Sequence, residues 1–532
     1  MLTLPSAQAN VKQGGRDVIV MRGINYSAQT TDGDLADSLN VSARRYPYLS
    51  TRKAREKQTG YAKASALTAW GKLVVVKNDG TDALPDYELY YDGTKIGQLS
   101  STDGGKKQFA VVNTKLVIWP DKKYLDTSSL TIKSLAATFT YTGATFAEDS
   151  ITFGGGTNLT TLFNAGDGVT VSGCTAETGN NKDVVIKAVA AHKITVSDHT
   201  FTAATETASI KIERKVPDMD FICESENRLW GCSSSKQTIY ASALGDPCNF
   251  NVFENLSTDS YAIAVGSEGD FTGCCKLASS VLFWKENLLH KMLGSYPAEY
   301  QMYQYNVEGL RNGCSKSLQV INETLFYMGL HGVFAFTGGT PTLVSPNFGE
   351  RSFSDAVAGN DGDSYYLSCK DTSNAWHLFV YEFRNNLWVH EDNVECVDFA
   401  RIGKDLYFLD SDGYVWLAAT GSDDANMEWM AQFTPFYEVT STRNKTGATV
   451  ERKRYSKIVL RLELPVKSYV VVSVKRDDEP WQEVGQVIGT RNNTARVRIP
   501  ITRCDKFSVK LYGKGPCSVL AMSREYSLGS EV

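Results

Sequence analysis

The residues that could support catalysis are sparse and form no recognised motif. The chain lacks a GxSxG turn for a serine nucleophile, a GxxxxGK[ST] phosphate loop and an HExxH metal motif. No histidine lies three or four residues from another, the spacing that places two metal ligands on one helix face. We therefore expect isolated loop or strand-face histidines, no catalytic residue, no metal site and no cofactor. The six histidines are His192, His199, His290, His331, His377 and His390.

Residues 410–416 come closest to an enzyme feature. Their sequence, Asp-Ser-Asp-Gly-Tyr-Val-Trp, is similar to the SxDxGxTW turn of sialidase propellers. Here the Ser, Asp and Gly are contiguous and the turn occurs once, whereas sialidases repeat it. An Asp-Gly turn between apolar runs is a general hairpin signal. We interpret the segment as an ordinary hairpin that places an aromatic residue on the next strand.

Acidic loops and basic clusters have residue types that bind ions. The acidic loops at 360–363 and 423–424 lack the full spaced set of oxygen ligands that calcium requires. Cations within 44–57 could contact phosphate while neighbouring tyrosines stack on bases. The alternative is a loop whose cations are solvated or paired with carboxylates. Arg-Lys-Arg at 452–454 is a candidate anion patch, and its alternative is a solvated strand start. The cations of the first cluster are Arg44, Arg45, Arg52, Lys53, Arg55 and Lys57.

Composition favours a folded protein with a slight negative charge. Hydrophobic residues make up 42% of the 532 residues, and the net charge is -5. This balance argues against a protein that coats DNA through a basic surface. No apolar run reaches membrane-spanning length and the first residues do not resemble a signal peptide, so we expect no membrane insertion. The 11 cysteines show no CxxC spacing, which predicts reduced, mostly buried thiols in a protein made in a cytosol.

The elements that position these residues follow a repeat. Seven apolar runs recur, and the steps between their second residues are 43, 113, 53, 43, 41 and 40 residues. A period of about 40–45 residues with strands in every unit is typical of β-propeller blades. The long step indicates an insertion. The runs lie at 72–76, 115–119, 228–230, 281–284, 324–327, 365–367 and 405–409.

Two further regions depart from the repeat. The segment 131–213 is rich in Thr, Ala, Gly and Val and poor in the aromatic residues of the blades, which predicts an inserted small β-barrel or sandwich. After about residue 425, five apolar strands separated by Gly and Pro turns predict a β-sandwich. The predicted fold is all-β, a propeller of about seven blades with these two additions. Its parts are an extended N-terminal arm at 1–60, propeller at 61–130 and 214–425, the insertion at 131–213 and the sandwich at 426–532.

Three groups of residues resemble a known family. They are Asp-Gly-Asp at 32–34 with Tyr-Pro-Tyr-Leu at 46–49 and Arg-Lys at 52–53; Arg-Leu-Trp-Gly-Cys at 228–232 with 239–247 and Asn-Phe at 249–250; and Arg-Cys-Asp-Lys-Phe at 503–507 with Gly-Lys-Gly at 513–515. Together they resemble the tail hub or nozzle proteins of short-tailed bacteriophages, also called packaged-DNA stabilisation proteins. The motifs are turns and strands, so no catalytic residue is carried over.

The resemblance implies a structural protein of the virion that is made in the bacterial cytoplasm. It implies a homo-oligomeric ring, commonly of six copies, below the portal and adaptor proteins and next to tail fibres or spikes. Such a ring would hold packaged genomic DNA and form the channel for its ejection. Two alternatives are a propeller that binds or cleaves host-surface glycans and a head–tail connector ring. The first predicts a carboxylate-rich pocket at the central opening, and the second favours helical bundles.

Overall fold

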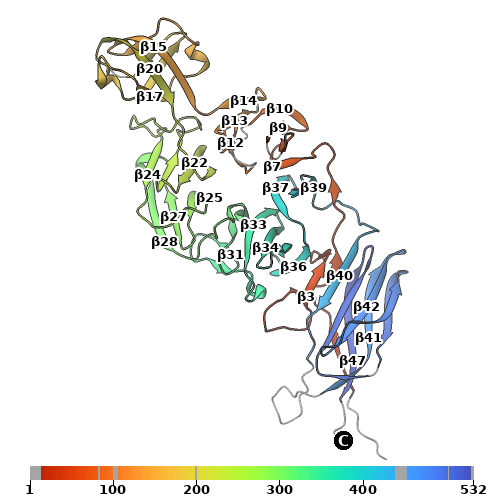
Figure 1. The fold of residues 1–532 in the computed structure, drawn as a ribbon. Helices are drawn as coiled ribbons and strands as arrows, with labels where there is room; N and C mark the ends of the chain where they lie inside the picture. The colour runs from red at the N-terminus through yellow and green to blue at the C-terminus, as the bar shows by residue number, and fades with distance from the viewer. Residues whose placement is uncertain are drawn as a thin grey trace, which may run out of the picture.

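The computed structural model describes residues 13–81, 84–99, 106–197, 200–437, 452–500 and 502–528. The regular structure of these residues is almost entirely β-strand, with five 3-10 helices of three residues each. No helix in this part of the chain has the length and apolar character needed to cross a membrane. The strands form a propeller, a barrel and a sandwich (Figure 1). This arrangement confirms the predicted fold class.

Seven four-stranded sheets form the blades of the propeller. Each apolar run of the sequence repeat is the second strand of one blade, from β8 (Lys72–Asn78) in blade 1 to β38 (Asp405–Asp410) in blade 7. A second strand pairs with a strand on each side and packs against other residues on both faces. It can therefore be apolar along its whole length, which explains why these runs give the clearest signal.

The blades follow one another along the chain, and the first strands of several neighbouring blades lie next to each other. Blades 1 to 3 are β7 (Ala64–Trp70), β8, β9 (Tyr87–Tyr91) and β10 (Thr94–Gln98); β11 (Gln108–Val112), β12 (Lys115–Trp119), β13 (Lys123–Asp126) and β14 (Thr131–Ser134); β21 (Phe221–Ser225), β22 (Arg228–Ser233), β23 (Thr238–Ala241) and β24 (Tyr261–Ala264). Blades 4 and 5 are β25 (Gly273–Leu277), β26 (Ser280–Trp284), β27 (Leu288–Leu293) and β28 (Gln301–Asn306); β29 (Gln319–Ile321), β30 (Thr324–Met328), β31 (Val333–Phe336) and β32 (Thr342–Leu343). Blades 6 and 7 are β33 (Phe353–Asn360), β34 (Ser364–Asp371), β35 (Trp376–Glu382) and β36 (Leu387–Asp392); β37 (Cys396–Ile402), β38, β39 (Val415–Leu417) and β6 (Glu56–Lys57).

Blade 7 is completed by a strand from near the start of the chain. β6 pairs with β39, so residues far apart in sequence close the ring. Apolar contacts support this closure, because Leu67 and Val75 of blade 1 pack in one cluster with Leu409 and Val415 of blade 7. A blade buries its faces only against its neighbours, and a closed ring leaves none of them at an exposed end.

The insertion is a closed barrel of six strands, in the order β15-β16-β19-β18-β17-β20. Closure pairs every strand on both sides, so this small unit has no exposed edge. Its own buried core is separate from that of the propeller. The first and last strands, which enter and leave the barrel, pair with each other at Ala137 and Arg214. The strands are β15 (Ala137–Ala147), β16 (Ser150–Thr152), β17 (Gly168–Ser172), β18 (Asp183–Ala190), β19 (Lys193–Val196) and β20 (Ala204–Arg214).

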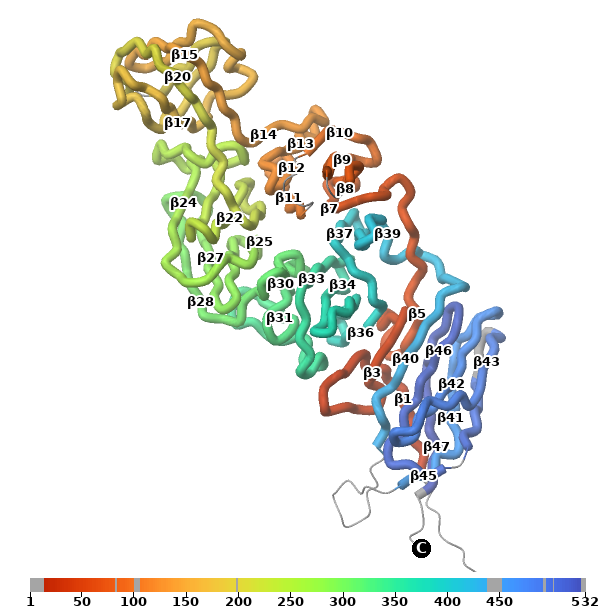
Figure 2. Tube along the Cα trace, viewed as in Figure 1, coloured from red at the N-terminus to blue at the C-terminus, as the bar shows by residue number. Residues whose placement is uncertain are grey.

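The sandwich consists of two sheets that enclose one apolar core. In Figure 2 the red N-terminal strands lie among the blue C-terminal ones. One sheet contains β1 (Gln13–Val18), β4 (Val41–Ser42), β5 (Leu49–Thr51), β41 (Lys453–Leu464), β44 (Arg491–Arg498), β45 (Arg503–Cys504) and β47 (Ser518–Leu528). The other contains β2 (Gly23–Ile24), β3 (Asp34–Leu39), β40 (Glu428–Phe433), β42 (Tyr469–Arg476), β43 (Gln482–Ile488) and β46 (Phe507–Lys514).

The N-terminal region differs from the extended arm that the sequence predicts at 1–60. Between Gln13 and Lys57 the chain contributes five strands to the sandwich and one to blade 7. Several of these strands have only two or three residues, which is too short to show an alternating pattern. Their pairing is decided by partners near the other end of the chain, such as β47 for β1 and β40 for β3.

All 11 cysteines are free, and ten of them are buried. Cys275 is the partly exposed one, next to buried Cys274. Burial also raises the pKa of Cys174 to about 11, which keeps this thiol protonated. The prediction of mostly buried thiols is therefore confirmed.

Candidate functional site: the joint between propeller and sandwich

The basic segment, defined as residues 44–57, lies where the sandwich meets blades 6 and 7. All six cations have partners within the protein, which favours the carboxylate-paired alternative over phosphate contact. A cation already held by a carboxylate has little free charge to offer a ligand. Arg44 pairs with Asp361, Arg45 with Glu463, Lys53 with Asp423, and both Arg52 and Arg55 with Glu391, while Lys57 lies over the ring of Tyr414.

Arg55 is the most buried cation of the basic segment, with a side chain 9% exposed. Its guanidinium donates to Glu391 Oε1 over 2.9 Å and to Asp392 Oδ2 over 2.5 Å. It also lies over the ring of Phe408 in blade 7. Burial lowers the pKa of Arg55, but Asp392 and Glu391 outweigh that effect and hold the pKa above its ordinary value. The joint is therefore held by a buried cluster of ion pairs, and removal of one member would leave a buried charge without its partner.

A cleft of about 250 Å³ opens beside this cluster, between blade 6 and the sandwich. Glu382 lines it, and burial raises the pKa of this carboxyl although the Ser364 hydroxyl donates to it over 2.9 Å. A carboxyl with a raised pKa is the kind of group that serves as general acid in glycoside hydrolysis, but that reaction also needs a second, available carboxylate. The other carboxylates lining the cleft are held in ion pairs: Glu391 with Arg55, Asp423 with Lys53 and Glu463 with Arg45. The cleft is therefore better suited to a structural role than to catalysis.

Two histidines meet at the same joint, contrary to the expectation of isolated histidines. His377 Nδ1 and His390 Nε2 lie 3.3 Å apart because β35 and β36 are paired strands. His377 Nε2 lies 3.0 Å from Asp371 Oδ2, and His390 Nδ1 lies 3.0 Å from Asp37 Oδ1 on β3. These contacts connect blade 6 to the sandwich. His377 and His390 are 13 residues apart in sequence, a separation that matches no motif, and only the β35–β36 hairpin brings them together.

The other histidines are dispersed. His290 is buried with Nε2 2.8 Å from Ser267 Oγ, while exposed His331 lies beside Glu308. His192 is in the turn between two barrel strands. His199 lies outside the described residues.

The acidic loops considered for calcium use their oxygens within the protein. Asp361 accepts from Arg44, the hydroxyl of Tyr366 and the backbone N–H groups of residues 363 and 364. Asp423 pairs with Lys53, and Asp424 accepts from a backbone N–H two residues on. Groups of three or more potential metal ligands are absent from the part of the chain that the structure describes.

The turn at 410–416 is a hairpin stabilised by its first residue. Asp410 accepts from the backbone N–H of Tyr414 and from Trp416 Nε1, each over 2.7 Å. The carboxylate thus stabilises the turn and orients the aromatic residue, which confirms the interpretation as an ordinary hairpin.

In the basic cluster at 452–454, Arg452 pairs with Asp477 over 3.1 Å, and buried Lys453 lies 3.9 Å from Asp505.

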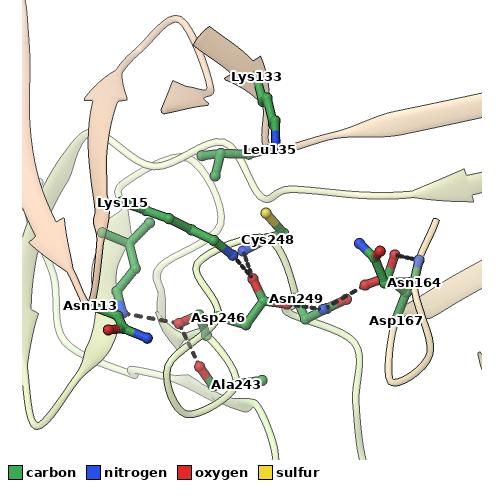
Figure 3. Close-up of polar contacts among 12 residues, drawn as sticks. Asn113, Lys115, Lys133, Leu135, Asn164, Asp167, Ala243, Asp246, Cys248 and Asn249 are labelled. Atoms are coloured by element: carbon green, nitrogen blue, oxygen red, sulfur yellow. Dashed lines mark hydrogen bonds and ion pairs between the residues drawn. The ribbon is translucent and has the colours of Figure 1, made fainter. Parts of the chain in front are cut away.

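A second joint holds the barrel to blades 2 and 3. Figure 3 shows Asp246 between Lys115 of blade 2 and Asn249, with Asn249 directed toward Asp167 of the barrel. Burial acts to raise the pKa of Asp246, but the Lys115 ammonium outweighs it and holds the pKa below its ordinary value. Asp167 also pairs with buried Arg214 at the end of the barrel. The insertion is therefore fixed by polar contacts on both of its flanks.

The carboxyls with raised pKa values are part of contacts between elements. Burial raises the pKa of Asp398 in blade 7, although this carboxylate accepts from Lys316 and from the backbone N–H of Leu67. Lys316 belongs to the segment before blade 5, and Leu67 to blade 1. Groups with shifted pKa values are often found at active sites, but ion pairs that stabilise a fold also shift the pKa values of their members. The second explanation fits Asp398, which pairs with Lys316, whereas burial accounts for the raised pKa of Glu382.

Comparison with known proteins does not define a family. No family model matches the chain, and no curated protein matches it. BamB from Moraxella catarrhalis is 10% identical with a TM-score of 0.31, over 70% of this chain and 98% of BamB. U3-55K is 8% identical with a TM-score of 0.33, over 69% of this chain and 99% of U3-55K.

An exo-β-1,3-galactanase from Phanerochaete chrysosporium is 7% identical with a TM-score of 0.21, over 56% of this chain and 92% of the enzyme. Similarity at this level carries no argument about the fold or the activity of this chain.

Proposed function

We propose that this chain is a structural subunit of a bacteriophage tail hub, a ring that holds packaged DNA and forms the channel for its ejection. The observation that carries the proposal is where the family-like residues lie. They lie at the two joints, in blade 3 and in the sandwich, where they form ion pairs, hydrogen bonds and core contacts.

The family-like residues in blade 3 support this view. Arg228 is fully buried and donates to the carbonyls of Ser242 and Ser257 over 2.8 and 2.6 Å. Asp246 and Asn249 then form the polar contacts at the base of the barrel. The loop between β23 and β24 is thereby fixed to both its own blade and the insertion.

The family-like residues at the two ends of the chain have a similar role. Asp32 pairs with Arg524 over 2.9 Å, and Arg524 is fully buried. Phe507 stacks on Tyr455, with ring centroids 3.9 Å apart, in the core of the sandwich. Arg52 and Lys53 belong to the basic segment, which joins the sandwich to the propeller.

The net charge of -5 is also compatible with a DNA channel. A surface with few free cations makes few phosphate contacts, so DNA can slide without being retained. A channel lined densely with unpaired lysine and arginine would contradict this part of the proposal. The electrostatic potential of the lumen, calculated from a structure of the assembled ring, tests it.

Native mass spectrometry and negative-stain imaging of the purified full chain test the proposal directly. We expect a closed homo-oligomeric ring, with six copies favoured, that binds to portal–adaptor complexes. Labelled antibodies should locate the chain at the tail of the virion. A monomer at tens of micromolar that hydrolyses polysaccharide would overturn the proposal and favour the glycan-cleaving alternative.

A further inference from the structure

A second cleft, of about 560 Å³, lies between the sandwich and blade 6. One wall is the segment between β2 and β3, with residues from the preceding turn. The other wall comes from the β35–β36 turn and from the 3-10 helix at Pro346–Phe348. We call it the amide cleft, because carboxamides dominate its lining. The side chains used below are Arg22, Gln29, Tyr46, Asn347, Asn385 and Asn386.

The polar groups of the amide cleft are largely available, unlike those of the smaller cleft. Within the described residues, the side chains of Arg22, Gln29 and Asn347 make no hydrogen bond or ion pair, and the same holds for Asn385. Asn386 uses its carbonyl oxygen to accept from Tyr381 and keeps its amide N–H groups free. In the smaller cleft each cation already has a carboxylate partner. The amide cleft therefore presents several unused donors and acceptors to one space.

The wall of the amide cleft is held rigidly from behind. Buried Asp34 accepts from Asn25 Nδ2 over 2.8 Å and from the backbone N–H of Thr31 over 2.7 Å. Gly33 has φ of +102°, and a Cβ there would lie 2.2 Å from the carbonyl oxygen of Val20. The loop thus has one tightly packed conformation. A preformed wall lowers the entropy cost of binding a ligand.

The chemistry of the lining selects a class of ligand. A carboxamide offers a donor and an acceptor together, which matches the hydroxyl groups of a polyol. The lining has one cation and one carboxylate. Asp34 is buried and accepts from its own neighbours, whereas Arg22 is exposed and unpaired among the described residues, so Arg22 is the charge that a ligand can reach and it attracts an anion. Apart from Leu387 and the Tyr46 ring, the lining offers little apolar surface for a peptide or a nucleobase.

We propose that the amide cleft binds an acidic saccharide, whose sugar units carry hydroxyl groups and a carboxylate. Arg22 pairs with the carboxylate through its planar guanidinium. Gln29, Asn347 and Asn385 exchange hydrogen bonds with the hydroxyls. Tyr46, whose side chain is 43% exposed, packs its ring against the C–H face of a sugar unit. This binding does not depend on assembly of a ring, so a monomer would show it as well.

Isothermal titration calorimetry of the full chain tests the proposal. The acidic probes are tetragalacturonate, tetramannuronate and a hyaluronan hexasaccharide; cellotetraose and tetraglutamate are the comparisons. We expect saturable binding of at least one acidic saccharide, with cellotetraose at least about tenfold weaker because it lacks the carboxylate. Tetraglutamate, which has carboxylates and no hydroxyls, should not bind. Failure of all three acidic saccharides to bind, or equal binding of tetraglutamate, overturns the proposal.

Variants assign the binding to this cleft. Arg22→Gln should weaken the acidic saccharide by at least about tenfold and remove its advantage over cellotetraose. Tyr46→Ala should weaken both saccharides. Arg384→Gln is the matched control, because Arg384 precedes Asn385 but is paired with Asp363 outside the lining. Arg22, Tyr46 and Arg384 are exposed, so the variants should keep the melting temperature of the parent. Binding that is unchanged in Arg22→Gln, or lost equally in Arg384→Gln, overturns the assignment.

Discussion

Arg55 Nη2 and Glu391 Oε1 lie 2.9 Å apart, and this contact joins the N-terminal part of the chain to the last strand of blade 6. Both side chains are less than a tenth exposed, at 9% and 7%. The pair therefore connects, inside the protein, two segments that are 336 residues apart in sequence. It shows how the sandwich and the propeller form one unit.

Replacing Arg55 with methionine should destabilise the protein by about 3 kcal/mol or more. The change leaves the carboxylate of Asp392 without its cation and leaves Glu391 with the more distant Arg52 alone, which costs far more than loss of a surface pair. Urea denaturation of the full chain measures the effect. Arg384→Met, which breaks an exposed pair with Asp363, should change stability by no more than about 0.5 kcal/mol. Equal effects of the two substitutions would contradict the role assigned to Arg55.

The closure of blade 7 can be weakened at one backbone group. The N–H of Gln58 donates to the carbonyl of Val415 over 2.8 Å, just beyond β6. Gln58→Pro removes this donor and should destabilise the protein by roughly 1–3 kcal/mol. Hydrogen exchange should increase in β39, measured by mass spectrometry of its peptides. Gln58→Ala keeps the N–H and should leave exchange unchanged; unaltered exchange in the proline variant would argue against closure through β6.

The barrel should be removable without unfolding the propeller. Residues 137 and 214 are paired across the first and last barrel strands, so a Gly-Ser linker of about three residues can join 136 to 215. The barrel core and the propeller cores are separate clusters. We expect the shortened chain to be soluble and to keep a cooperative thermal transition in circular dichroism. Aggregation of the shortened chain would mean that the barrel supports the propeller.

His290 should make the protein less stable in mild acid. Burial, with a contribution from the Lys285 ammonium, lowers the pKa of this imidazole to about 4, against an ordinary value of about 6.5. The stabilisation from keeping His290 neutral is complete above pH 6.5. It is lost as the pH falls toward 4, because the unfolded chain takes up a proton that the folded chain does not. The free energy of unfolding falls by at most ~3 kcal/mol through this effect.

Urea midpoints measured between pH 7 and pH 4 check this dependence. His290→Gln keeps a donor for Ser267 and removes the titrating group. We expect the parent to lose stability more steeply than the variant over this interval, so the difference between them should shrink toward pH 4. Parallel curves would show that other groups control the acid response.

Regular features were predictable from the sequence because they rest on local patterns. The second strands of the blades are apolar throughout, so seven runs at a regular spacing indicate seven blades, and the single long step reveals the insertion. The turn at Asp410 was predictable for the same reason, because the groups that donate to its carboxylate lie within six residues. Free, buried cysteines followed from their spacing.

The contacts at the joints were not predictable, because their partners are far apart in the chain. The sequence shows a basic cluster at 44–57 but contains no sign that Arg55 meets Glu391, or that Asp37 meets His390. Short N-terminal strands likewise have too few residues for a period, and their pairing depends on β40 and β47.

By itself, the sequence determined the all-β architecture, the number of blades and the position of the insertion, because hydrophobic periodicity is a local property of strands. Only the tertiary structure decided which charges are paired and which remain free. It showed that the cations of the basic cluster at 44–57 are paired within the protein, with Arg55 buried at the joint, and that Arg22 in the amide cleft is exposed and unpaired among the described residues. The physical reason is that the effect of a charge depends on its neighbours in space, which the fold brings together from distant parts of the chain.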